Sequence, residues 1–172
     1  MTKLAKQFFD HTITRRYVAL AWGDIERDGR IEGYIGRSQK NRIIMDVYRD
    51  EEKGKWSATN YKVLERLGAV TLVSCMLETG RTHQIRAHMK HIGHPLFSDA
   101  NYGGDKVLKN NTSAKFRQFV TNCFEIMPRQ ALHAQTLGFI HPTSQQYMEF
   151  ESPLPDDFSK VLTKWRNYSL LQ

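Results

Sequence analysis

Residues 77–99, LETGRTHQIRAHMKHIGHPLFSD, concentrate side chains that could do chemistry. The stretch holds two arginines, one lysine and four histidines but only two acids, Glu78 and Asp99. Three kinds of site suit such a composition: a metal held by imidazoles, a phosphate held by cations, and a carboxylate held by an arginine. Each kind makes a different demand on how the stretch folds.

A metal site is the least favoured of the three. His88, His91 and His94 recur at every third position, and two histidines at that spacing on a helix can share an ion. However, Gly93 should end the helix before His94, and no HExxH or Cys/His set accompanies the histidines. Arg86 and Lys90 also bring positive charge to the place where a metal ion would lie. We therefore predict no metal site and rank a metal hydrolase last among the functions considered.

A phosphate site agrees better with the sequence. Gly80 should turn the chain into a helix with Thr82 as its N-cap, and the free N–H groups of the first turn can then face an anion. Cations between residues 81 and 110 are Arg81, Arg86, Lys90, Lys106 and Lys109, and an earlier group is Arg37, Lys40 and Arg42. A solvated basic face is the alternative, and it is less favoured when several cations surround one helix start.

The third kind of site concerns Arg86 alone. Helical spacing places it beside Ile85, at the border of the apolar face formed by Ile85, Met89 and Ile92. An arginine there needs a carboxylate partner, because an unpaired buried charge costs several kcal/mol. The partner could form a structural ion pair or be a catalytic acid that Arg86 holds in place.

The elements that must position these side chains alternate between strands and helices. Gly68 predicts a tight turn, and Gly93 followed by Pro95 predicts a helix end. The expected strands are 16–23, 30–37, 42–49, 57–67, 69–79, 130–140 and 146–152, and the expected helices include Leu4 to Phe9, 82–92, 116–124 and 155–168. The pattern predicts an α+β fold with a mixed, largely antiparallel sheet and flanking helices.

Composition limits the partners and the number of domains. The 172 residues suffice for one domain, and a net charge of +7 favours a polyanionic partner, either nucleic acid or an acidic membrane surface. No stretch approaches the ~20 apolar residues of a membrane span. Cys75 and Cys123 are read as reduced thiols, which predicts a cytoplasmic protein. The strand 16–23 is apolar on both faces and needs neighbours, which suggests that sequence is missing before residue 1.

Three segments together resemble the RluA-type pseudouridine synthases, which convert uridine to pseudouridine in ribosomal and transfer RNA. They are ETGRTHQIRAHMKHIGHPLFSDANYGG, RRYVALAWG and RQALHAQTLGFIHPTSQQYMEFESPLP. They cover nearly the whole chain in the family's order. The resemblance implies a sheet with a central RNA-binding cleft, no metal or organic cofactor, and attack by an aspartate on a flipped uridine, followed by C1′–N1 cleavage and C1′–C5 bond formation.

The resemblance also implies roles for single residues. Tyr17 would stack on the uracil and help remove the C5 proton, Arg86 would pair with the catalytic aspartate, and Leu132 would wall the uracil pocket. The RNA-binding residues expected from the resemblance and from charge are Arg81, Thr82, His83, Lys90, Arg37, Lys40, Arg42 and Lys106. Gly93, His94, Pro95 and Asp99 are read as scaffold for the following loop.

The sequence departs from the family at the nucleophile. The family's aspartate lies in an HRLDxxTSG segment before the tyrosine, and none of the nine aspartates here has that context. We therefore expect residues 1–172 to be the C-terminal portion of one synthase catalytic domain, a partial synthase fold that is inactive alone. Its partner would be RNA, ribosomal rather than transfer, and exposed strand edges would favour self-association. A non-catalytic RNA-binding remnant of the same fold is the alternative function.

Overall fold

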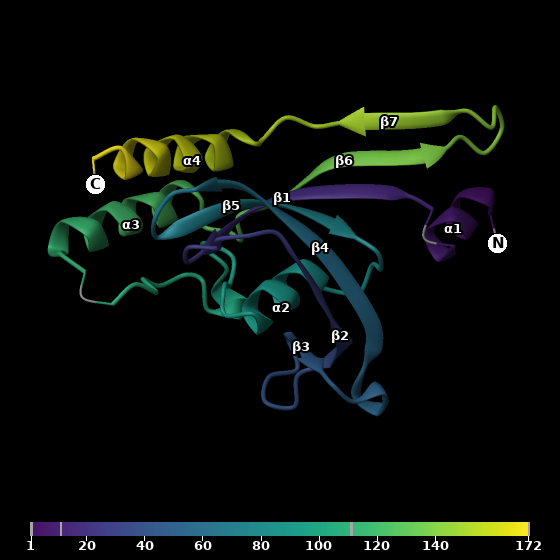
Figure 1. Cartoon of the computed structure of the whole chain (residues 1–172), viewed down its shortest axis with the longest axis horizontal. Helices are drawn as coiled ribbons and strands as arrows, with labels where there is room; N and C mark the ends of the chain where they lie inside the picture. The colour runs from purple at the N-terminus through teal and green to yellow at the C-terminus, as the bar shows by residue number, and fades with distance from the viewer. Residues whose placement is uncertain (1, 11, 111, 172) are drawn as a thin grey trace.

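One sheet of seven strands forms the centre of the molecule in a computed structural model, which describes residues 2–10, 12–110 and 112–171 (Figure 1). The strand order is β3-β2-β4-β5-β1-β6-β7, and each of the six described pairings is antiparallel. The strands are β1 Thr14–Trp22, β2 Gly29–Arg37, β3 Met45–Tyr48, β4 Lys55–Arg66, β5 Val70–Leu77, β6 Leu132–Ile140 and β7 Tyr147–Glu151.

Four α-helices accompany the sheet: α1 Lys3–Phe9, α2 Gln84–His91, α3 Ala114–Ile126 and α4 Asp156–Ser169. Two short 3₁₀ helices, η1 Glu51–Lys53 and η2 Ala100–Tyr102, lie in loops. The predicted α+β class and largely antiparallel sheet are confirmed. The third strand is shorter than the predicted 42–49, because residues 42–44 belong to a turn closed by a hydrogen bond from Ser38 N to Ile44 O. No helix in the described ranges is both long and apolar enough to cross a bilayer.

Strand β1 lies between β5 and β6, and its residues 18–22 are buried on both faces. This confirms that the strand needs neighbours on each side. Cross-strand partners in an antiparallel sheet share a face, so Leu20 and its β5 partner Leu72 point to one side while Ala19 and Val73 point to the other.

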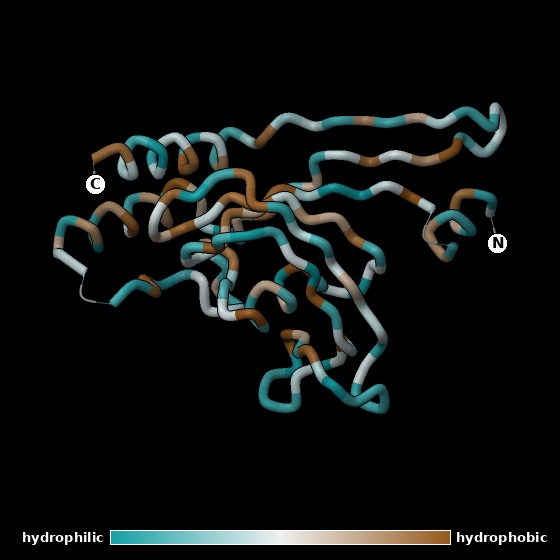
Figure 2. Tube along the Cα trace, in the orientation of Figure 1, coloured by the Kyte–Doolittle hydropathy of each residue, from teal (hydrophilic) through white to brown (hydrophobic). Residues whose placement is uncertain are grey.

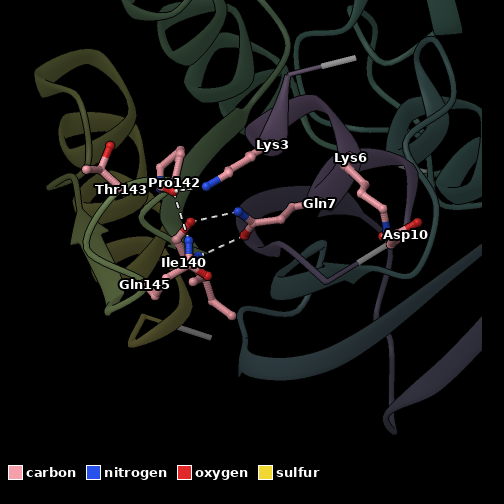
Figure 3. Close-up of a pocket in the computed structure, with 8 residues that line it drawn as sticks. All are labelled: Lys3, Lys6, Gln7, Asp10, Ile140, Pro142, Thr143 and Gln145. Atoms are coloured by element: carbon pink, nitrogen blue, oxygen red, sulfur yellow. Dashed lines mark hydrogen bonds and ion pairs between the residues drawn. The ribbon is translucent and has the colours of Figure 1, made fainter.

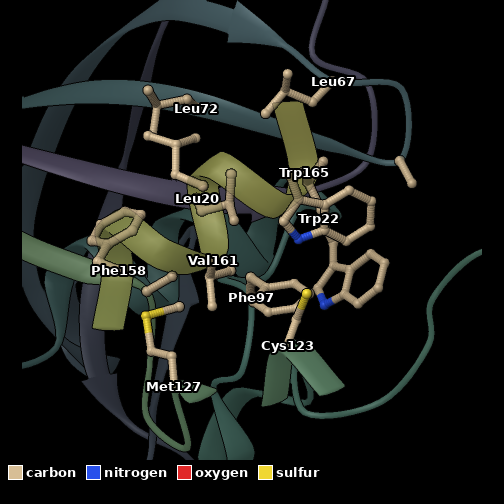
Figure 4. Close-up of a cluster of buried hydrophobic side chains, with 14 of the residues drawn as sticks. Leu20, Trp22, Leu67, Leu72, Phe97, Cys123, Met127, Phe158, Val161 and Trp165 are labelled. Carbon is tan, nitrogen blue, oxygen red and sulfur yellow. The ribbon is translucent and has the colours of Figure 1, made fainter. Parts of the chain in front are cut away.

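Helices α3 and α4 pack on the first of these faces (Figure 4). Trp22 lies at the centre of the cluster, with ring centroids 5.2 Å from Phe97 and 6.1 Å from Trp165. The predicted inward positions of the last helix are confirmed, since Phe158, Leu162 and Trp165 are all buried.

Helix α2 packs on the opposite face of the sheet. Ile85 and Met89 are buried against Ala19, Ala21 and Val73, and Ile92 packs partly against the same cluster. The helix ends as predicted at Gly93, which has a positive φ of 86°. The helix therefore holds the GRTHQIR segment against β1.

Helix α1 lies beside the far end of the β6–β7 hairpin (Figure 1). It buries no side chain; instead, the Gln7 amide bonds both backbone groups of Ile140, at 2.6 Å and 2.8 Å (Figure 3). At the foot of the molecule, the loop between β2 and β3 is hydrophilic and exposed (Figure 2). Solvent-exposed elements therefore lie at both ends of the sheet: α1 at one end and the β2–β3 loop at the other.

Candidate functional site

A cavity of about 310 Å³ lies where β1, α2 and the start of β6 meet. It brings together the three predicted catalytic residues Tyr17, Arg86 and Leu132, which come from three separate parts of the chain. The lining residues are Tyr17, Leu77, Arg81, His83, Gln84, Ile85, Arg86, Gln130 and Leu132. The cavity combines apolar walls with an arginine and a phenol, as sites for small polar ligands commonly do.

Pairing between β1 and β6 positions two of these side chains. Ala19 pairs with Leu132 and Tyr17 with Ala134, so Tyr17 and Leu132 project from the α2 side of the sheet. The register shifts between Arg16 and Tyr17, which marks an irregularity next to the tyrosine. Such irregularities re-aim side chains near sites.

Arg86 is bound by a carboxylate from the loop after α2. Its Nε and Nη2 each donate to Asp99, both at 2.8 Å, and the two residues are 8% and 1% exposed. These hydrogen bonds raise the pKa of Arg86, so the guanidinium is charged. The sequence predicted a carboxylate partner but treated Asp99 as loop scaffold. Asp99 does also cap η2, since it accepts a hydrogen bond from Tyr102 N, so it both shapes the loop and holds Arg86.

Tyr102 supports the same arginine from the other side. Its ring centroid lies 4.6 Å from the Arg86 Cζ atom, a cation–π distance. Its hydroxyl oxygen accepts from Met45 N at 2.9 Å and lies 3.1 Å from His83 Nδ1. Burial, followed by the charge of Arg86, lowers the pKa of His83, so a neutral imidazole can accept a hydrogen bond from the Tyr102 hydroxyl. The arrangement fixes Arg86 at the edge of the cavity.

The turn before α2 is organised by Gln84 rather than by Thr82. The Gln84 Oε1 atom accepts from Arg81 N at 2.9 Å and Thr79 Oγ1 at 2.7 Å, while its Nε2 donates to Ala58 O and Thr59 Oγ1. The prediction of Thr82 as N-cap is wrong: the N-cap is His83, at φ 53°, and Thr82 is exposed in the turn. Gln84 bonds the backbone of Arg81 three residues earlier, but an arginine is not a capping-box residue, so no local sequence signal marked Gln84.

The predicted RNA-binding residues divide into two groups. Arg81 and His83 line the cavity; Thr82 and Lys90 are exposed nearby on the turn and on α2. Arg37, Lys40 and Arg42 are exposed on or beside the β2–β3 hairpin, and Lys106 is exposed in the loop before α3. None of these last four residues lines the cavity. Of these predicted cations, Arg81 therefore lines the cavity itself, while Arg37 lies near enough to His83 to contribute to lowering its pKa.

The histidines of α2 do not converge on an ion. His88 is fully buried, with its ring nitrogens 2.9 Å from Thr59 Oγ1 and 3.1 Å from Ser57 Oγ, while His91 is exposed. Burial lowers the pKa of His88 to about 4, so its imidazole is neutral and structural at neutral pH. Within residues 2–10, 12–110 and 112–171, no group of three or more potential metal ligands comes together.

A hollow of about 370 Å³ between α1 and the β6–β7 turn contains none of the predicted site residues (Figure 3). Its Lys6 and Asp10 form an exposed ion pair at 2.6 Å. Exposed pairs of this kind contribute little energy. The cavity beside Tyr17 therefore remains the candidate functional site.

Comparison with known proteins identifies the family. The family model described as RNA pseudouridylate synthase matches residues 1–91, more than half of the chain. The chain belongs to this family, which confirms the resemblance to RluA-type synthases.

Individual relatives agree with this assignment. The chain is 43% identical over 166 residues to an uncharacterized RNA pseudouridine synthase of Chlorobaculum parvum, covering 95% of this chain and 50% of that protein. It is 44% identical over 164 residues to ribosomal large subunit pseudouridine synthase D of Nitrosomonas europaea, covering 95% and 44%. Human RNA pseudouridylate synthase domain containing 4 shares the fold, with a TM-score of 0.73 at 19% identity and coverage of 95% and 66%. The chain thus spans about half the length of the curated relatives it matches.

Proposed function

We propose that this chain forms one side of the active site of an RNA pseudouridine synthase that modifies ribosomal RNA. The observation that carries the proposal is that Tyr17, Arg86 and Leu132 line one cavity although they come from β1, α2 and β6. The name of the Nitrosomonas relative supports ribosomal RNA over transfer RNA. No cofactor enters the proposed chemistry.

A flipped uridine would enter the cavity. Leaving the base stack costs a few kcal/mol, and contacts within the site must offset that cost. The Tyr17 ring would stack on the uracil, while Leu132, Ile85 and Leu77 provide apolar walls. The Tyr17 phenol would then help to remove the C5 proton once the uracil has turned.

Arg86 would hold the nucleophilic carboxylate. Asp99 binds the Nε–H and one Nη2–H, so the two N–H groups of Nη1 and the second N–H of Nη2 can bind a second anion. In the proposal, an aspartate supplied by protein sequence outside these 172 residues binds there and attacks the uridine. It follows that residues 1–172 alone bind RNA without converting it.

The first experiment assays the 172-residue chain with an unmodified large-subunit ribosomal RNA transcript. We expect RNA binding and no pseudouridine above background. Pseudouridine formed by the chain alone would contradict the assignment of the nucleophile to other sequence.

The second experiment tests catalysis directly with a chimera. In the Nitrosomonas relative, the aligned half is replaced by this chain, and we expect the chimera to form pseudouridine in the same transcript. Tyr17→Phe and Arg86→Gln should each abolish conversion, while Arg16→Gln, on the opposite face of β1, should not. A folded but inactive chimera that still binds RNA would favour the alternative, a non-catalytic RNA-binding protein.

A further inference from the structure

Arg15 is the most unusual charged residue outside the cavity. Its Nε atom is buried and has no hydrogen-bond partner among the described residues. Like Arg16 and Arg81, it forms no ion pair with a carboxylate in the described part of the chain, and the buried Nε distinguishes it from them. The guanidinium has no carboxylate partner, and its side chain lines two hollows, so an external anion that reaches the Nη nitrogens beside the buried Nε would be stabilising there.

Strand alternation places Arg15 on the same side of the sheet as the candidate site. Arg15 and Tyr17 are two residues apart on β1, and Arg15 pairs with Leu137 of β6, which pairs in turn with Phe150 of β7. Cross-strand partners share a face, so Arg15, Leu137 and Phe150 form a row leading away from the cavity.

Two hollows flank the Arg15 side chain. One, of about 360 Å³, is lined in part by Phe8, Arg15, Tyr17, Leu137 and Phe150. Its single acid, Glu151, pairs with Thr136 and therefore leaves the strand on the face opposite to Phe150. The hollow thus offers one guanidinium between aromatic and aliphatic surfaces.

The second hollow, of about 300 Å³, connects Arg15 with the cavity. It is lined by Phe8, Phe9, Arg15, Gly80 and Arg81, and Arg81 also lines the Tyr17 cavity. A methyl group at Gly80 would overlap the Arg15 guanidinium, so the glycine of GRTHQIR leaves space for this arginine. Arg81 forms no ion pair with any described carboxylate; its Nε donates to Trp56 O at 2.9 Å.

We infer that Arg15 and Arg81 bind a phosphodiester of single-stranded RNA, and that Phe8 and Phe150 stack on the base of a nucleotide flanking the target. The inference rests on the proposed function, because the target uridine would occupy the Tyr17 cavity. Two guanidinium forks suit a phosphate, and aromatic rings bind unpaired bases without regard to sequence. The Phe8 and Phe150 rings are 44% and 52% exposed, so both are accessible to a base.

Helix α1 supplies one wall of this subsite. The Arg15 Cζ atom lies 5.8 Å from the Phe8 ring centroid, a distance at which the ring and the cation attract. Figure 1 shows α1 next to the outer end of β1 and the β6–β7 hairpin, and the hollow lined by Phe8, Arg15 and Phe150 extends to Tyr17.

The test measures binding of a labelled oligouridylate to the 172-residue chain. Arg15→Gln should weaken binding about tenfold, as expected for the loss of a charged hydrogen bond. The slope of log K against log salt should become shallower by about 0.7, the value for one phosphate contact on a single strand. Arg16→Gln is the matched control: it removes the same charge from the next residue on the opposite face, and it should change affinity less than about twofold.

Two further variants separate the parts of the subsite. Phe150→Ala should weaken binding about tenfold with an unchanged salt slope, because stacking releases no counterions. Gly80→Ala should weaken binding as Arg15→Gln does, because the added methyl group displaces the Arg15 guanidinium although its charge is kept. The melting temperature of Arg15→Gln should equal or exceed that of the parent, since the residue has an unpaired buried nitrogen.

Equal weakening by Arg15→Gln and Arg16→Gln, or no binding of the oligouridylate by the parent chain, would overturn the subsite. These outcomes are distinct from failure of the proposed function, which is judged by pseudouridine formation in the chimera. If the chimera is active but Arg15→Gln and Arg16→Gln weaken oligouridylate binding equally, only the proposed subsite is wrong. If the chimera folds but is inactive, and Arg15→Gln weakens binding more than Arg16→Gln, only the catalytic proposal is wrong.

Discussion

At the scale of single residues, Arg86 and Asp99 form a buried ion pair at the candidate site. Two hydrogen bonds of 2.8 Å and near-complete burial make each partner dependent on the other. Removing one partner of such a pair leaves an uncompensated buried charge. Asp99 therefore acts as a positioning residue for Arg86, and its loss should affect stability as well as the site.

Asp99→Asn should lower the free energy of unfolding by about 3 kcal/mol, the cost typical of breaking a buried pair. Urea denaturation at neutral pH measures the change. Asp24→Asn is the matched control, because Asp24 forms a two-pronged pair with Arg66 at an exposed position. A control effect as large as that of Asp99→Asn would show that burial does not determine the cost.

His88 should make stability depend on pH. In the unfolded chain the imidazole titrates near 6.5, whereas burial and the nearby His91 lower its native pKa to about 4. Between these values only the unfolded state binds the proton, so the free energy of unfolding falls as pH falls below 6.5. From about pH 7 to pH 5 the His88 contribution to this loss is about 2 kcal/mol. Urea denaturation at both pH values should show a smaller loss for His88→Gln than for the parent.

The residue types of the candidate site were predictable from the sequence, but the carboxylate that binds Arg86 was not. The position of Arg86 beside an apolar helix face required a carboxylate, and the motif resemblance correctly grouped it with Tyr17 and Leu132 in space. The choice of Asp99 depends on a loop that folds back, with Ser98 at φ 63° and Gly104 N bonded to Asp99 O. Helical or strand periodicity contains no information about such a loop.

At the scale of elements, regular periodicity predicted the strands and helices, while their ends followed side-chain hydrogen bonds. The turn at Gly68 was predictable because only glycine readily adopts its φ of 76°. The start of α2 was misplaced because Gln84 bonds the turn from within the helix. Helix α1 was predicted from Leu4 to Phe9, but it buries no residue and is held partly through Gln7. Local hydrogen bonds therefore determine where α2 begins and how α1 is attached, and hydropathy patterns do not reveal these hydrogen bonds.

The loop that presents Asp99 gives a prediction about neighbouring glycines. A methyl group at Gly104 would overlap the carbonyl oxygen of Leu96, and backbone cannot move aside as a side chain can. Gly104→Ala should therefore cost roughly 3 kcal/mol or more and disturb the Asp99 contact with Arg86. Gly103→Ala has free space and only a positive φ of 82°, so it should cost about 1 kcal/mol. Thermal and urea unfolding of both variants measure the difference.

At the scale of the whole molecule, the sheet has two open edges, β3 and β7. The β6–β7 hairpin extends away from α3 and α4 (Figure 1), and it exposes Leu137, Ile140, Tyr147 and Phe150 by 39–56%. Figure 2 shows the hydropathy along it. An unpaired edge with apolar neighbours is a template for pairing with another chain. We therefore expect copies of the chain to associate through this hairpin.

Sedimentation velocity at micromolar and near-millimolar concentrations should show a sedimentation coefficient that increases with concentration. Leu137→Lys should reduce this increase, because a charge on the exposed face opposes packing. Leu64→Lys, at an exposed leucine of β4 away from the hairpin, serves as the control. A parent chain that stays monomeric at the higher concentration would contradict the prediction.

The central place of β1 also affects how the chain reaches its native state. Thr14 must pair with Gly138, so two segments 124 residues apart have to meet before the sheet is continuous. Contacts so distant in sequence form slowly, because a long loop must close before any pairing energy is gained. During synthesis, β1 emerges before β6, and we expect molecular chaperones to protect its open side during that interval.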